Sequence, residues 1–172
     1  QINIEDAPAV LEGNRRQVFD TGDGALPNYY NVGGQPKGFA TGDLNGDGYI
    51  DVITANGSAN TVSVLLNNGD GTFAAAVHVN AGPNPDSVAM ADIDRDGDLD
   101  LAIANDVGVV VLRNNGNATF ASPTGLAAPN DPSSVVIGDF NNDGNVELAY
   151  MNHAIGANSV SVALSDGTGG YL

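Results

Sequence analysis

The sequence predicts an all-β protein built from β-propeller blades, each with four antiparallel strands. Three markers recur in one register: an acidic loop, a glycine-rich turn and a proline. The acidic loops occupy residues 43–51, 92–100 and 139–147, spaced by 49 and then 47 residues. Repeats of about 40 to 50 residues that hold four short strands are typical of propeller blades. An ordinary β-sandwich has no reason to repeat an acidic loop in register.

Each repeat is predicted to form its strands in a fixed order around the acidic loop. A strand of small residues precedes the loop, which suits the crowded axis where blades converge. An alternating strand follows the loop, and a third strand ends at the glycine-rich turn, where glycine supplies the positive φ of a tight hairpin. The predicted strands are 38–42, 50–55, 62–66 and 74–79; 87–91, 99–104, 109–112 and 121–126; and 134–138, 146–151 and 160–164.

The same register predicts the blade boundaries. They are a blade remnant at 1–36, repeats at 37–84 and 85–131, and a third repeat at 132–172 that lacks its fourth strand. In the remnant we expect a third strand at 15–19, a turn at 20–24 and a fourth strand at 29–32. Closed propellers need about 4–8 blades, so this partial propeller closes only in a longer chain or an oligomer. A homodimer would complete the ring if the remnant's last strand joined the third repeat of a second copy.

Charge and composition exclude several classes of function. Acidic residues outnumber basic ones by 21 to 5, so the formal net charge is −16 at pH 7. That charge argues against binding nucleic acid and against electrostatic attachment to anionic lipid. The longest apolar stretches are far shorter than a membrane span, so we expect no membrane insertion. An acidic chain with cation sites fits an extracellular protein.

The acidic loops present oxygen ligands in a repeated pattern. Side-chain oxygens stand at positions 1, 3, 5 and 9, a main-chain carbonyl at position 7, and glycine at position 6. Calcium selects this arrangement, because clustered carboxylates repel one another unless a cation lies among them. We therefore predict three Ca2+ sites. The predicted ligands are Asp43, Asn45, Asp47, the Tyr49 carbonyl and Asp51; Asp92, Asp94, Asp96, the Asp98 carbonyl and Asp100; and Asp139, Asn141, Asp143, the Asn145 carbonyl and Glu147.

Other readings of the loops explain less. An EF-hand needs glutamate at position 12, which these loops lack, and the all-oxygen ligand set disfavours zinc and copper. Asp-Gly and Asn-Gly pairs form turns without metal, but turn chemistry alone does not place acids at matching positions in three loops. Position 8 is apolar in each loop, as Ile50, Leu99 and Val146, and is predicted to bury the loop's exit in the blade core.

The three loops, each followed by an alternating strand, resemble the repeats of integrin-α-type propellers and especially VCBS/FG-GAP-like repeats. The resemblance covers about residues 15–172. It departs at the Phe-Gly and Gly-Ala-Pro pairs that name the FG-GAP repeat, which residues 38–40 and 81–83 only echo. It implies that calcium loops stabilise one face, and that a protein or glycan ligand binds the opposite face. The connections there would be 33–37, 56–60, 81–86, 105–108, 129–133 and 152–158.

We therefore expect a calcium-stabilised extracellular module for protein or carbohydrate binding or adhesion, and not an enzyme. The clustered acids are assigned to cation sites, and the two histidines are read as packing or solvated residues. One alternative is a non-catalytic accessory or substrate-binding part of a larger secreted lyase or hydrolase. Another is a spacer in a large surface protein. Asn56 and Asn117 match the N-glycosylation pattern, which arises often by chance in so asparagine-rich a chain.

Overall fold

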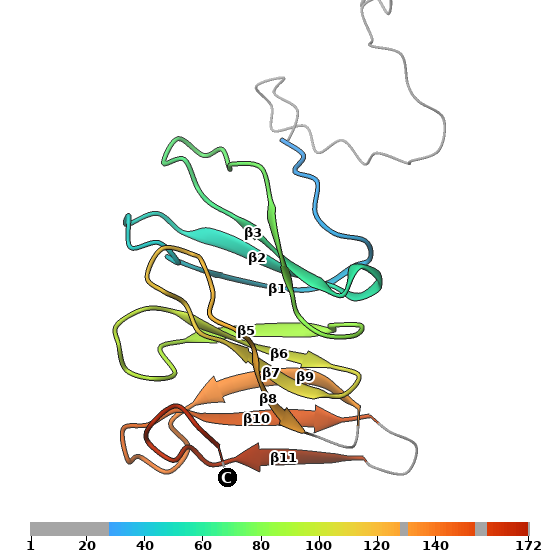
Figure 1. Ribbon diagram of the computed structural model, residues 1–172, viewed down its shortest axis with the longest axis vertical. Helices are drawn as coiled ribbons and strands as arrows, with labels where there is room; N and C mark the ends of the chain where they lie inside the picture. Colours follow the sequence, from blue (N-terminus) through green and yellow to red (C-terminus); the bar gives the residue numbers. More distant parts are fainter. Residues whose placement is uncertain (1–27, 128–130, 154–157, 172) are drawn as a thin grey trace, which may run out of the picture.

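Three antiparallel sheets stack on one another in the computed structural model (Figure 1). The structure describes residues 28–127, 131–153 and 158–171. No helix among these residues is long and apolar enough to cross a membrane. The first sheet contains β1 (Pro36–Gly42), β2 (Asp51–Asn56), β3 (Thr61–Leu65) and β4 (Val77–Asn80); the second contains β5 (Ser87–Ala91), β6 (Asp100–Asn105), β7 (Gly108–Leu112) and β8 (Thr124–Ala127); the third contains β9 (Pro132–Gly138), β10 (Glu147–Asn152) and β11 (Ser159–Ala163).

The strand order confirms the predicted all-β meander. Strands that follow one another in the chain are neighbours in each sheet, and the paired strands are antiparallel. The predicted strand ends between residues 36 and 164 differ from the observed ends by no more than three residues. A single 3-10 turn at Gly57–Ala59 interrupts the strand-and-loop pattern of the described residues.

The predicted strand at 29–32 is wrong, because residues 28–32 are irregular. Tyr30 instead packs edge-to-face on Phe73, with ring centroids 5.4 Å apart, and its hydroxyl accepts the Phe73 N–H at 3.0 Å. This segment is therefore attached to the first sheet through a side chain and not through a strand ladder. The other predicted elements of the remnant, at 15–19 and 20–24, lie outside the described residues.

The first strands of the three sheets lie next to one another, so that β1 contacts β5 and β5 contacts β9. A Cβ atom at Gly38 would lie 2.8 Å from the Asp86 carbonyl oxygen and 3.0 Å from Ser87 Cα. Both neighbours are backbone atoms, which cannot move aside as a flexible side chain can. Glycine is therefore required at this closest approach, as the predicted crowding of the first strands implies.

Two hydrophobic clusters fill the junctions between the sheets. Successive side chains of a strand point to opposite faces, so the middle sheet contributes to both clusters. Leu101 and Ile103 of β6 lie in the first cluster, whereas Ala102 and Ala104 of the same strand lie in the second. All six residues of β6 are buried. The first cluster also contains Leu44, Ile53, Ala55, Val62, Val64, Ala81, Val88 and Leu112; the second also contains Ile93, Val109, Val111, Val135, Leu148 and Ala163.

The outward face of the third sheet is apolar and exposed. Val162 is 51% exposed, whereas its repeat equivalent in the second sheet, Val111, is 3% exposed. Phe140 in the third acidic loop is also 51% exposed, whereas Ile93 at the same loop position is 3% exposed. The third sheet packs over the second and covers Val111 and Ile93. The described residues provide no further sheet that covers the third in the same way.

The prediction that position 8 of each acidic loop is buried is wrong for Ile50, which is exposed. Leu99 and Val146, at the same position, are partly buried and pack against the first and second clusters. Leu99 reaches the preceding sheet, since a Cβ atom at Gly42 would lie 2.6 Å from its Cδ1. Position 8 therefore packs on the sheet before its own, and no sheet precedes the first among the described residues.

Candidate metal centres

The three acidic loops share one hydrogen-bond scheme. In the second loop the Asp92 carboxylate accepts the N–H groups of Asp96 (3.1 Å) and Gly97 (3.0 Å). Gly97 has a φ of 98°, which favours glycine at this turn. The loop backbone thus wraps around its own first carboxylate. The equivalent bonds run from Asp47 and Gly48 to Asp43, and from Asp143 and Gly144 to Asp139.

The carboxylate at position 9 is buried and ties the loop to the strands. Asp100 accepts the N–H of Ile93 at the start of the loop (3.0 Å) and the N–H of Asn114 after β7 (2.8 Å). One side chain therefore holds the loop, the start of β6 and the exit of β7 together. Asp51 makes the equivalent bonds in the first sheet, from Leu44 (2.9 Å) and Asn67 (2.8 Å).

Glu147, at position 9 of the third loop, accepts the backbone N–H at the start of its loop, but among the described residues it accepts none from the segment after the third strand. Its Oε2 accepts the Phe140 N–H at 2.9 Å, which matches the bond from Ile93 to Asp100. Its Oε1 is buried and has no hydrogen-bond partner among the described residues. A buried carboxylate oxygen without a partner is costly, and a bound cation would provide one.

The second loop gathers its carboxylates most closely. Oxygen atoms of Asp92, Asp94 and Asp100 lie within 4.8 Å of one another, and Asp94 Oδ1 is buried without a hydrogen-bond partner among the described residues. Burial raises the pKa of Asp100, and the charges of Asp94 and Asp96 raise it further, although hydrogen bonds from Asn114 and Ile93 oppose the shift. A cation among these oxygens would offset both the burial and the repulsion. The donor set fits Ca2+.

Asparagine stands at position 3 of the other two loops and stabilises the position 5 carboxylate. Asn141 Nδ2 lies 2.9 Å from Asp143 Oδ2, and Asn45 Nδ2 lies 2.9 Å from Asp47 Oδ2. The Asn145 N–H and the Asn141 amide lower the pKa of Asp143. In these loops a neutral donor thus balances part of the negative charge.

Position 7, predicted to ligate through its carbonyl, has its side chain against the glycine-rich turn of the same repeat. A Cβ atom at Gly116 would lie 2.6 Å from Asp98 Oδ2, and one at Gly69 would lie 2.6 Å from Tyr49 Cζ. Asn145 lies less tightly against Gly167. The first glycine of the turn thus leaves room for the acidic loop, which explains why the two markers repeat together.

Arginine side chains join the second loop to the third sheet and loop, and we did not predict them. Arg113 Nη1 lies 2.9 Å from Asp94 Oδ2, and its Nη2 donates to the Gly169 carbonyl oxygen. Arg95 Nη1 lies 3.2 Å from Asn145 Oδ1 of the third loop. Alignment of the repeats carries the signal for Arg113, because leucine occupies the equivalent position of the first repeat.

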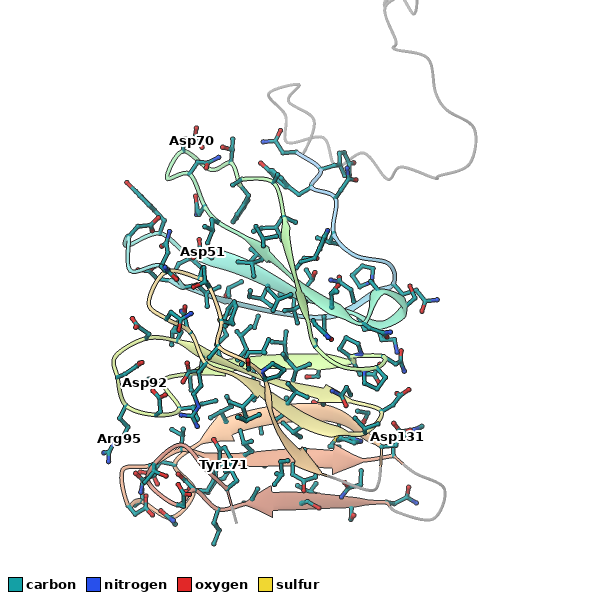
Figure 2. The ribbon with its side chains drawn as sticks, in the orientation of Figure 1. Asp51, Asp70, Asp92, Arg95, Asp131 and Tyr171 are labelled. Atoms are coloured by element: carbon teal, nitrogen blue, oxygen red, sulfur yellow. The ribbon has the colours of Figure 1, made fainter. Side chains whose placement is uncertain are left out.

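A polar network joins the first two sheets at the opposite ends of their strands. Lys37 Nζ donates to Asn84 Oδ1 (2.7 Å) and pairs with Asp86, and Asn84 Nδ2 donates to Asp106 Oδ1 (2.7 Å). Figure 2 shows this separation of the two ends, with Asp51 and Asp92 on one side and Asp131 on the other. The network's groups bond to one another, so they fasten the sheets together. Ligand binding on this face stays a prediction.

One buried asparagine ends the second strand of each of the three sheets. From the sequence we singled out only Asn56, as an N-glycosylation match, and its burial argues against that modification. The structural role of the three asparagines was not predicted. Their spacing of 49 and 47 residues is the signal that could have found them. Each uses its amide to hold a neighbouring segment, so each blade has a buried polar group at both ends of its second strand. The bonds are Asn56 Nδ2 to Ser63 Oγ (2.8 Å), Asn105 Nδ2 to the Ala81 carbonyl (2.9 Å) and Asn152 Nδ2 to Ser161 Oγ (2.9 Å).

The stacked sheets and their equivalent acidic loops define a repeat protein of propeller-like architecture. The family model described as "FG-GAP-like repeat" matches residues 43–103 and 92–150. The chain therefore belongs to the FG-GAP-like repeat family, which confirms the resemblance carried by the acidic loops.

Comparison with solved structures relates the chain to a lectin of Agrocybe aegerita, described as recognising non-reducing terminal N-acetylglucosamine specifically. The two are 25% identical, with a TM-score of 0.56. The match covers 77% of this chain and 36% of the lectin chain, so this chain spans little more than a third of the lectin's length. Comparison with curated proteins found no match.

Proposed function

We propose that this chain is a calcium-stabilised, non-catalytic extracellular module that binds carbohydrate. The observation that carries the calcium part is the cluster of Asp92, Asp94 and Asp100, which includes a buried oxygen without a partner among the described residues. The likeness to a lectin supports carbohydrate over protein as the ligand. The glycan recognised by that lectin makes terminal N-acetylglucosamine the first candidate.

Calcium would be held in each loop by the side chains at positions 1, 3, 5 and 9 and the carbonyl at position 7. The ion supplies the positive charge that the clustered carboxylates need. The chain's own part is structural, because Asp100 and Asp51 also hold the backbone after the third strand of their sheets. A cation that fixes position 9 therefore stiffens the contact between a loop and the third strand.

Thermal unfolding in calcium and in chelator tests the calcium proposal. A ligand that binds only the folded state adds about 2.7 kcal/mol per site at a hundredfold excess over its Kd. We therefore expect a higher Tm in Ca2+ than in chelator, with a smaller effect of Mg2+, which prefers a tighter octahedral shell. An unchanged Tm after verified removal of metal would contradict the proposal.

A glycan array probed with the calcium-loaded protein tests the carbohydrate proposal. Binding to glycans with a non-reducing terminal N-acetylhexosamine is the expected result. Competition by free N-acetylglucosamine would show that the terminal sugar is recognised. If no glycan on the array bound, the carbohydrate proposal would be overturned. A binding module would then need a protein as its ligand.

We also propose that a second copy of the chain covers the outward face of the third sheet. The interface would continue the packing already present between sheets, in which each sheet covers the outward face of the one before it. The first sheet offers the matching surface, because Phe39 is 74% exposed there while Val88, its repeat equivalent, is buried against the first sheet. Such a head-to-tail contact closes into a ring when the rotation permits.

Light scattering at several concentrations tests the dimer. We expect association that weakens in Val162→Asp, because a carboxylate would be buried without a partner in the interface. Val107→Asp is the control, since Val107 is similarly exposed but lies in the turn between β6 and β7. A monomer at every concentration would refute the self-association.

A further inference from the structure

A cavity of about 170 Å³ lies between the second and third sheets, on the side of the acidic loops. It is lined by Val111, Arg113, Gly125, Leu126 and Tyr171 among others. A single water needs only about 10–15 Å³ of such space, so the cavity has room for a group larger than one water. It is smaller than the roughly 300–1,000 Å³ of sites for drug-sized ligands, and therefore matches a single small ring.

The equivalent place between the first and second sheets is filled by apolar side chains. Leu66, Val79, Ala118 and Phe120 are partly buried there and pack against the first cluster. All four of these positions carry a different residue at the second junction, where the cavity lies. The repeat equivalents of Leu66, Val79, Ala118 and Phe120 are Arg113, Leu126, Gly169 and Tyr171.

The cavity presents hydrogen-bonding groups that the described residues do not use up. Arg113 has five N–H donors, of which one is directed to Asp94 and one to the Gly169 carbonyl. The Tyr171 hydroxyl is buried and has no hydrogen-bond partner among the described residues. Burial raises the pKa of Tyr171 to about 12, so this hydroxyl stays protonated and can both donate and accept.

The charge of the cavity is balanced, which decides the class of ligand. The Arg113 guanidinium is paired with the Asp94 carboxylate at 2.9 Å, so an anionic ligand would compete with an existing ion pair. A neutral ligand can accept from the remaining guanidinium N–H groups without breaking that pair. Val111 and Leu126 add apolar surface beside these donors. Hydroxyl groups on a ring with an apolar face satisfy both requirements.

We propose that this cavity binds the terminal sugar ring of a glycan, with hydroxyl groups toward Arg113 and Tyr171 and an apolar face against Val111 and Leu126. The proposal rests on the proposed carbohydrate-binding function and gives it a location. That location differs from the face opposite the acidic loops, which the family resemblance led us to expect.

The second acidic loop and the cavity share one carboxylate. Asp94 Oδ2 pairs with Arg113, and Asp94 Oδ1 is buried beside Asp92 and Asp100 without a hydrogen-bond partner among the described residues. A cation in the second loop would fix the carboxylate that positions the Arg113 guanidinium. Sugar binding is therefore expected to weaken in chelator and in Asp96→Ala, which changes a predicted ligand of this loop outside the cavity lining.

Calorimetry with N-acetylglucosamine, using the full chain, tests the location. Thr124→Phe is the blocking variant, because Thr124 lines the cavity and pairs with Val111, so its side chain shares the cavity face of the sheet. Phenylalanine is larger and suits a strand. Tyr171→Phe reproduces the residue of the first junction, and Tyr29→Phe, at an exposed tyrosine outside the cavity and the acidic loops, removes a hydroxyl elsewhere as the control. We expect affinity to fall roughly tenfold or more in the first two variants, because polar partners are lost or the space is filled.

The outcomes separate this inference from the proposed function. Unchanged affinity in Thr124→Phe and Tyr171→Phe, with sugar still bound by the unmodified chain, would overturn the cavity and leave the carbohydrate proposal standing. An unmodified chain that binds no glycan on the array and no free sugar would overturn both. Unfolding curves of each variant in calcium check the fold, and Thr124→Phe decides the matter if Tyr171→Phe is unstable.

Discussion

The second and third acidic loops have the same length and the same backbone bonds, yet they balance their charge differently. The second holds five acids, and its position 3 carboxylate is paired with Arg113, the residue directly after β7. The third holds three acids, and the asparagine at position 3 donates within the loop. Position 9 also differs, because Asp100 accepts two backbone N–H groups whereas Glu147 accepts one.

Because of this difference in charge balance, the second and third loops are connected differently to the rest of the molecule. The third loop balances most of its charge through its own asparagine and meets the second loop at the exposed bond from Arg95 to Asn145, so its proposed cation would affect mainly the third sheet. The second loop is connected through Asp94 and Arg113 to a neighbouring sheet and to a cavity. A change in the second loop should therefore be felt across a junction, and the same change in the third loop should stay local.

The largest difference is expected between Asp100→Ala and Glu147→Ala, measured by urea unfolding in chelator so that metal plays no part. Asp100→Ala leaves two buried N–H groups without an acceptor, at about 1–3 kcal/mol each. Glu147→Ala leaves only one, so its loss of unfolding free energy should be about half. Equal losses would contradict the separate hydrogen-bonding roles of the two carboxylates.

A smaller effect is expected when position 3 is exchanged between the loops. Asp94→Asn should weaken calcium binding about tenfold, and Asn141→Asp should strengthen it, because each added carboxylate stabilises a nearby divalent cation. Calcium titration calorimetry measures both. Asp106→Asn removes the same charge at the opposite ends of the strands and serves as the control. No change in either exchanged variant would argue against position 3 as a ligand.

The smallest effect is expected at position 4, where backbone geometry and a side-chain contact oppose each other. Arg95 has a left-handed φ of 66°, and glycine occupies the same position in the first loop with a φ of 71°. Arg95→Gly relieves backbone strain and loses the exposed bond to Asn145, so the net change should lie within about 0.5 kcal/mol. Arg95→Ala keeps the strain and loses the bond, so it should be the less stable of the two in urea unfolding.

Much of the fold follows from local patterns in the sequence. The acidic loops begin and end strands at defined points, and the alternation of apolar residues in β2 and β6 follows the two-residue period of a strand. The predicted loop residues are adjacent in the chain, so proximity required no knowledge of tertiary structure. This is why the side chains of Asp92, Asp94 and Asp100 lie close together as expected, while their metal remains a prediction.

The features that could not be predicted depend on which sheet lies next to which. Ile50 and Leu99 occupy the same loop position, but only Leu99 has a preceding sheet to pack on. Arg113 and Leu66 occupy the same repeat position. Alignment shows that the residue type changes there, but only the structure shows that Arg113 meets a glycine-lined turn of the next repeat. The repeat spacing assigns the two members of each pair to the same position in their blades. Their surroundings differ, because they are set by neighbours about fifty residues away in the chain.

The complete burial of β6 bears on how the chain folds. A strand enclosed on both faces reaches its full stability only after the sheets on either side have formed, so the middle sheet is the cooperative link between the outer two. Its amide hydrogens should exchange with solvent most slowly, and those of β11 should exchange far sooner. Each hydrophobic cluster lies between two sheets, so a single repeat cut from the chain would leave both faces of its sheet uncovered. A lone copy of this unit would therefore not have been a stable ancestor of the repeat array.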